Sequence, residues 1–154
     1  MKHTDNEKDP QVAGEHLVSE SSKFAEYYPD HPPRTESALF RKTKKHWHEL
    51  GTECYINHDC KGGIEIHHRY VEWAFAGAVD WNLMRELHPD FDWSTFNDAT
   101  DFVDSIYNTL PLCEAHHRDP QCGVHHVPAP NWEIQRYVRG DYKLFPDKDN
   151  NGRP

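Results

Sequence analysis

Cysteines and histidines are concentrated in the middle of this chain. Ten of the thirteen histidines lie between His46 and His126, and all four cysteines fall in the same stretch. Thiolates and imidazoles are the ligands that zinc and related transition metals prefer in proteins. Cysteines of an intracellular protein bind metal more often than they form disulfides. The composition therefore predicts a metal-binding protein.

One set of these residues has spacing typical of a structural zinc site. Cys113 and His116 form a C-x2-H pair, which lets two ligands hold one tetrahedral ion. An earlier cysteine pair, with five residues between its members, could supply the other ligands. His58 and Cys122 are alternative ligands, and buried free thiols are the alternative to any zinc site. The predicted structural zinc ligands are Cys54, Cys60, Cys113 and His116.

A second chemistry is indicated by three histidine doublets, at 67–68, 116–117 and 125–126. Ile64 and Ile66 alternate with polar residues in IEIHH, which predicts a short strand. Adjacent strand residues point to opposite sides, so one histidine of the first doublet can bind a metal while the other faces a substrate. Metal-assisted hydrolysis needs such a pairing of cation and proton acceptor.

These doublets resemble the two halves of the HNH nuclease motif. NTLPLCEAHH, which begins at Asn108, is similar to its second half, in which a metal-binding histidine follows the asparagine nine residues later. IEIHH resembles the first half, where the residue before the general-base histidine binds the metal. The HH form is similar to that of the colicin nuclease domains, which use three histidine ligands. The resemblance covers residues 52–138.

The resemblance implies a role for each matched residue. His68 is expected to be the general base, and Asn108 would fix its tautomer and orientation through its side chain or its backbone. His67 and His117 would hold a divalent cation (Mg, Mn, Ni, Co or Zn) against a DNA phosphate. The family's third ligand would fall at Gln121, so we expect His125 from the later GVHH string to replace it, with His126 as the alternative. About 40 residues separate the two half-motifs, which implies an inserted helical segment.

The resemblance also implies the fold. We expect an α+β protein with a ββα-metal (His-Me finger) core, a short β-hairpin plus a helix, embedded in additional helices. Strands are predicted at 64–68 and 109–113. Helices are predicted from a cap at Thr35 or Ser37 to Leu50, within 70–87, within 88–107, from 114, and over 132–138.

Acidic residues outnumber basic ones, 26 to 17, so the net charge is −9. That charge is unusual for a protein that binds DNA, because neutralising phosphates drives affinity. The one dense basic cluster is a candidate DNA contact, although a solvated helix face is the simpler interpretation. We also consider Arg69 and Arg118 as phosphate contacts, with ordinary surface positions as the alternative. The basic cluster comprises Arg41, Lys42, Lys44 and Lys45.

The domain organisation follows from composition. Residues 1–33 are read as an acidic, flexible arm, 34–140 as the nuclease domain and 141–154 as a polar tail. No apolar run long enough to span a membrane and no secretory signal is present, so we expect a cytoplasmic protein, in the host cytoplasm if phage-encoded. The small size suggests a phage or mobile-element protein, and the arm could recruit a larger packaging or recombination protein.

Two rival functions fit parts of the same sequence. A zinc-stabilised binding module without catalytic activity would explain the acidic charge through a protein partner. A metallohydrolase for nucleotides or small phosphoesters is a further alternative, but it would need acidic metal ligands in pairs. No paired carboxylates occur at ligand spacing. The sequence favours a DNA endonuclease over both.

Overall fold

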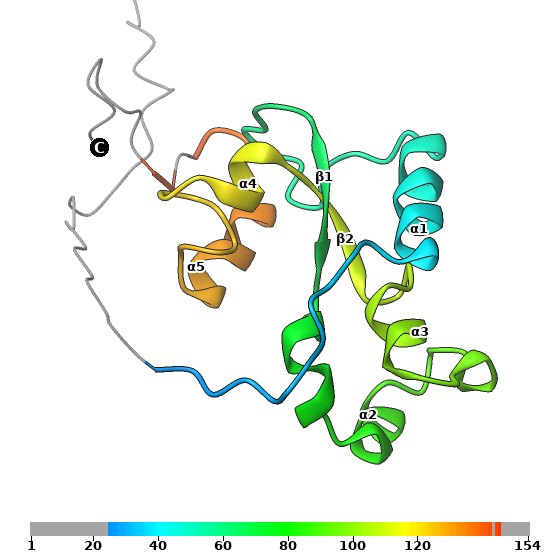
Figure 1. The fold of residues 1–154 in the computed structure, drawn as a ribbon. Helices are drawn as coiled ribbons and strands as arrows, with labels where there is room; N and C mark the ends of the chain where they lie inside the picture. Colours follow the sequence, from blue (N-terminus) through cyan, green and yellow to red (C-terminus); the bar gives the residue numbers. More distant parts are fainter. Residues whose placement is uncertain (1–24, 143, 146–154) are drawn as a thin grey trace, which may run out of the picture. The chain divides into compact units, whose positions relative to one another are not determined.

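The computed structural model describes residues 25–142 together with 144 and 145. Within them the chain is α+β, with a two-stranded antiparallel sheet among short helices (Figure 1). The strands are β1 (Ile64–His68) and β2 (Thr109–Cys113). The α-helices are α1 (Ala38–Glu49), α2 (Trp81–Leu87), α3 (Ala99–Val103), α4 (Glu114–Arg118) and α5 (Ala129–Glu133). Short 3-10 helices cover Trp73–Ala78, Trp93–Thr95 and Ile134–Arg136.

The described residues form two compact units. One consists of 25–55 and Ile64–Leu112, and the other of Ile56–Gly63 and 113–142 with 144 and 145. Of the expected arm, residues 1–33, the first 24 residues lie outside the described residues. Most of the expected tail, residues 141–154, lies outside them as well. No helix in the described part of the chain is long and apolar enough to cross a membrane.

Helix α1 begins where the sequence predicts. Ser37 has an extended backbone, and its hydroxyl accepts a hydrogen bond from the Phe40 amide at 2.9 Å, which is the usual N-cap arrangement. The indole of Trp47 donates to the Thr109 hydroxyl at 2.9 Å, which ties α1 to β2. Figure 1 shows α1 lying beside the sheet, within the unit formed by residues 25–55 and 64–112. Leu50, the predicted end of the helix, is its exposed C-cap.

The segments between the two strands form an aromatic core. Phe102 and Val103 of α3 are completely buried, and Val71, Ala76 and Phe91 are buried beside them. Partly buried aromatic side chains complete the cluster, among them Trp73, Trp81, Trp93, Phe96 and Tyr107. The predicted helical segment 70–87 is divided into a 3-10 helix and α2, and the Asp80 carboxylate caps α2 through the amides of Asn82 and Leu83. The inserted segment thus supplies a core of its own.

The other unit contains α4 and α5. Cys113 is the N-cap of α4, since its sulfur accepts from the His116 amide at 3.5 Å. The Trp132 indole of α5 donates to the His116 carbonyl at 2.9 Å, so the two helices are joined directly. Helix α5 begins at Ala129, three residues before the predicted start, because proline is favoured in the first turn of a helix.

Candidate metal centre and histidine sites

Four predicted zinc ligands form one group. The Sγ atoms of Cys113 and Cys60 lie 3.1 and 3.9 Å from Nδ1 of His116. One ligand atom from each of Cys54, Cys60, Cys113 and His116 lies within 4.8 Å of the others, so the group could hold a metal ion. Ligand atoms around a tetrahedral zinc ion are separated by about 3.5 Å, which matches these distances. The two alternative ligands, His58 and Cys122, are not part of the group.

Local backbone structure brings these ligands together. Gly62 adopts φ +83°, a conformation that glycine tolerates without strain. The turn then accepts two backbone hydrogen bonds from the start of α4, from Glu114 to Gly63 at 3.0 Å and from Ala115 to Lys61 at 3.2 Å. Cys60 at the beginning of this turn is therefore held near the first turn of α4. Cys113 and His116 are 0% and 2% exposed, so a charged thiolate there would need a compensating cation.

His117 and His125 form a second close pair. Their Nε2 atoms lie 3.1 Å apart, and their ring centroids are 4.9 Å apart. A tight turn between them brings His125 back to His117, and in it the Gly123 amide donates to the Asp119 carbonyl at 2.7 Å. The turn requires glycine, because a Cβ at position 123 would collide with the Asp119 backbone. Of the two candidates in the GVHH string, it is His125 whose ring lies against His117.

His68 contacts a carboxylate that the sequence did not indicate. Its Nε2 lies 3.0 Å from Oδ1 of Asp104, which is completely buried at the end of α3. Arg34 also bonds to Oδ1, and the Ser37 hydroxyl donates to Oδ2 at 2.5 Å. The Phe40 ring stacks on His68 with centroids 4.8 Å apart. Neither spacing nor motif connects residues 68 and 104, so this contact was missed.

The pKa of Asp104 is lowered to about 2. Burial by itself raises this pKa, but hydrogen bonds from His68, Arg34 and Ser37 stabilise the ionised form, and the positive charge of Arg34 adds to them. The carboxylate is therefore ionised at any physiological pH. It can only accept hydrogen bonds in that state.

The Asn108 side chain is used for backbone contacts. Its Oδ1 accepts from the amides of Tyr70 and Val71 at 2.9 and 3.1 Å. Its Nδ2 donates to the carbonyls of Val71 and Val103, both at 2.8 Å. All four hydrogen-bonding positions of the buried amide are therefore occupied by main chain. Asn108 holds the exit of β1 against α3, and the side chain that contacts His68 is Asp104.

The remaining histidine of the first doublet, His67, is 8% exposed and lies in β1. His68 is the more accessible of the two, with 16% of its side chain exposed. Burial does not alternate along β1: His67 is buried, and the other four residues are partly buried.

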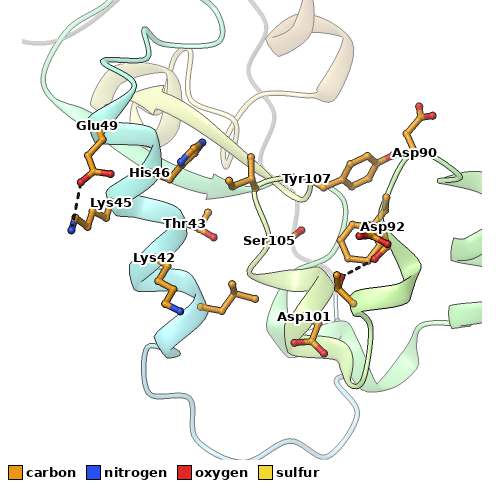
Figure 2. Close-up of a pocket in the computed structure, with 14 residues that line it drawn as sticks. Lys42, Thr43, Lys45, His46, Glu49, Asp90, Asp92, Asp101, Ser105 and Tyr107 are labelled. Atoms are coloured by element: carbon orange, nitrogen blue, oxygen red, sulfur yellow. Dashed lines mark hydrogen bonds and ion pairs between the residues drawn. The ribbon is translucent and has the colours of Figure 1, made fainter.

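Two of the four residues of the basic cluster on α1 form ion pairs with glutamates. Arg41 donates to the Glu36 carbonyl at 2.9 Å, Lys44 pairs with the Glu36 carboxylate, and Lys45 lies 3.5 Å from Glu49. Among the described residues, no ion pair involves Lys42. It faces a cavity of about 720 Å³, shown in Figure 2, in which Lys42, Lys45 and His46 lie on one side and Asp90, Asp92 and Asp101 on the other.

The two candidate phosphate contacts have different surroundings. The guanidinium of Arg69 lies over the rings of Tyr55 and Tyr70, 5.4 and 4.9 Å from their centroids. Arg118 of α4 forms an i,i+4 ion pair with Glu114 at 3.5 Å, and both side chains are more than half exposed. Stacking leaves the edge of a guanidinium available to an anion, so Arg69 is the better placed of the two.

Comparisons of the chain with protein-family models, with curated proteins and with solved structures found no match. The functional argument therefore depends on the side chains described above.

Proposed function

We propose that the chain is a metal-dependent endonuclease of the HNH type that hydrolyses DNA phosphodiester bonds. The observation that carries this proposal is the pair of Nε2 atoms of His117 and His125, 3.1 Å apart. Two imidazole nitrogens at this distance either share one proton or bind the same cation. His125 is exposed, so a substrate phosphate can reach a cation held there. A histidine pair with a purely packing role would be expected to be buried.

We propose His67 as the third ligand, because it directly precedes His68, where the resemblance to the HNH motif places a metal ligand. Three protein ligands are typical of catalytic sites, since they leave coordination positions open for substrate and water. Imidazole ligands favour Zn, Ni, Co or Mn, and Mg with fewer histidines engaged is the alternative. A bound divalent cation would stabilise the charge of the phosphate and of the leaving 3′ oxygen in the transition state.

His68 would act as the general base in this reaction. It takes a proton from water as the water oxygen forms the new bond to phosphorus, and the bond to the 3′ oxygen breaks. The leaving oxygen then takes a proton from solvent water. A neutral imidazole can accept a proton at physiological pH, which suits His68 to this step. Arg69 would bind a neighbouring phosphate through the free edge of its guanidinium.

The Cys/His group would hold a structural zinc ion. Three sulfur ligands and one imidazole nitrogen form a donor set that zinc prefers and that magnesium does not. Cys113 ends β2 and His116 lies in α4, so the ion would fix the junction that places His117. The order of β1, β2 and α4 along the chain supports the HNH assignment.

A zinc-stabilised binding module is the second candidate, and the pairing of the basic side chains favours it. Lys44, Lys45 and Arg118 each form an ion pair with a glutamate, and the net charge of the chain is −9. Such a surface attracts phosphate weakly, so a protein partner would be the expected ligand. This candidate gives no role to an accessible His117–His125 pair.

The test is cleavage of supercoiled plasmid by the purified chain, scanned over Mg, Mn, Ni, Co and Zn, with His68→Ala beside the wild type. We expect metal-dependent nicking or linearisation that the variant loses while its far-UV circular dichroism and zinc content stay unchanged. Absence of cleavage with every metal, in a folded protein that contains stoichiometric zinc, would reject the nuclease and favour the binding module.

A further inference from the structure

The buried carboxylate of Asp104 joins three segments of its unit. Its Oδ1 accepts from His68 and Arg34, and its Oδ2 accepts from Ser37, the N-cap of α1. The backbone carbonyl of the same residue accepts from the Thr43 hydroxyl at 2.7 Å. Both carboxylate oxygens therefore have partners, and each partner comes from a position remote in sequence. A buried charge that is satisfied in this way holds its partners in a single geometry.

The direction of the hydrogen bond to His68 follows from the charge of the acceptor. Ionised Asp104 has no proton to donate, so the proton in the 3.0 Å contact must reside on Nε2 of His68. A neutral imidazole has only one ring proton. The lone pair of neutral His68 is therefore on Nδ1.

The imidazole plane is fixed by a second contact. The Phe40 ring stacks on His68 with an interplanar angle of 22°. The Arg34 guanidinium lies 5.7 Å from the centroid of the same Phe40 ring and 5.2 Å from that of Trp73. Rotation of the imidazole would break both the stack and the bond to Asp104. The ring is thus held with one defined edge directed away from Asp104.

We propose that Asp104 is a positioning residue for His68: it holds the Nε2–H tautomer and so presents Nδ1 as the atom that takes the proton from water. Arg34 supports this role, because its charge keeps Asp104 from competing for the proton. When Nδ1 takes the proton, His68 becomes a cation whose Nε2–H points at a carboxylate, which stabilises it. The inference rests on the proposed function and specifies which ring nitrogen of His68 accepts the proton.

A purely structural role for Asp104 makes a different prediction. The carboxylate could simply anchor Ser37 and Arg34, and the contact with His68 would then carry no preference for a tautomer. Nitrogen chemical shifts of histidine distinguish the two neutral tautomers directly. Asp104→Asn keeps the shape of the side chain but removes the charge, and its amide can donate to Nε2. Thr43→Val is the matched control, because the Thr43 hydroxyl bonds to the backbone carbonyl of Asp104 and not to its carboxylate.

The experiment is a ¹⁵N spectrum of histidine-labelled full-length chain above neutral pH, combined with plasmid cleavage kinetics. We expect His68 of the wild type and of Thr43→Val to carry its proton on Nε2, and Asp104→Asn to shift it toward Nδ1. We also expect Asp104→Asn to lower kcat at least about tenfold with little change in KM, as removal of orienting partners usually does.

An Nδ1–H tautomer in wild-type His68 would overturn the proposal. This measurement needs no variant, so the proposal can be tested even if Asp104→Asn does not fold. An active enzyme whose tautomer and kcat are unchanged in Asp104→Asn would overturn it while leaving the nuclease intact. A wild-type chain without cleavage activity would remove both proposals together.

Discussion

The Sγ atom of Cys113 lies 3.1 Å from Nδ1 of His116, and this contact joins the end of β2 to the first turn of α4. Both side chains are almost completely buried. A thiol and an imidazole at this distance either share a hydrogen bond or bind the same metal ion. The proposed structural zinc ion predicts that the stability of this unit depends on metal.

Removal of one buried sulfur should release the ion. Cys113→Ser is expected to lower the zinc content from about one ion per chain to near zero. A chelator should lower the melting temperature of the wild type, because the free energy of metal binding at such a site contributes directly to the stability of the fold. Elemental analysis and thermal denaturation measure both. Cys122→Ser is the control, because that thiol donates to the Ala115 carbonyl and is outside the group. Zinc-free wild type would return the cysteines to ordinary packing.

The buried amide of Asn108 should matter chiefly for stability. Asn108→Ala leaves two amide protons and two carbonyls of the main chain without their partner. We expect a loss of about 3 kcal/mol or more in the free energy of unfolding, measured by urea denaturation. Asn82→Ala, an exposed position in α2, should change it by less than about 0.5 kcal/mol. Equal effects at the two sites would contradict the hydrogen bonds described for Asn108.

Stability should depend on pH through Asp104. Its pKa is about 2 in the folded protein, below the ordinary value of 3.8, so its ionised form stabilises the fold above pH 4. This contribution, roughly 2 kcal/mol, is lost as the pH falls from about 4 to about 2.

The measurement for Asp104 is the difference in unfolding free energy between wild type and Asp104→Asn as the pH is lowered. Any metal released by acid is lost from both proteins, so it cancels in this difference. We expect the difference to shrink through that window. A difference independent of pH would mean that the carboxylate is not the group responsible.

Lys42 should contribute more to DNA binding than its neighbours do. Among the described residues it has no ion-pair partner, whereas Lys44 pairs with Glu36. Lys42→Gln is expected to reduce the slope of log affinity against log salt by about 0.9, the value for one lost phosphate contact. Lys44→Gln is the matched control and should leave the slope nearly unchanged. Equal slopes for wild type and both variants would make α1 a solvated face.

Local signals predicted the elements well and the long-range contacts poorly. Thr35 or Ser37 was predicted as the helix cap, and IEIHH and TLPLC as strands, because caps and alternation depend on neighbouring residues. The Cys/His group was predicted from ligand spacing. The contact of His68 with Asp104 was not, because it depends on how α3 packs, and Asp104 belongs to no motif. The same is true of the backbone contacts of Asn108, which only the fold reveals.

The measurement that tests the central claim most directly is plasmid cleavage by His125→Ala and His126→Ala, compared with the wild type over a titration of the activating metal. Both histidines are exposed, and only the ring of His125 lies against His117, so neither substitution should disturb the fold. We predict that His125→Ala loses cleavage or needs far more metal, while His126→Ala behaves as the wild type. Full activity of His125→Ala at the wild-type metal concentration would contradict the proposed metal site.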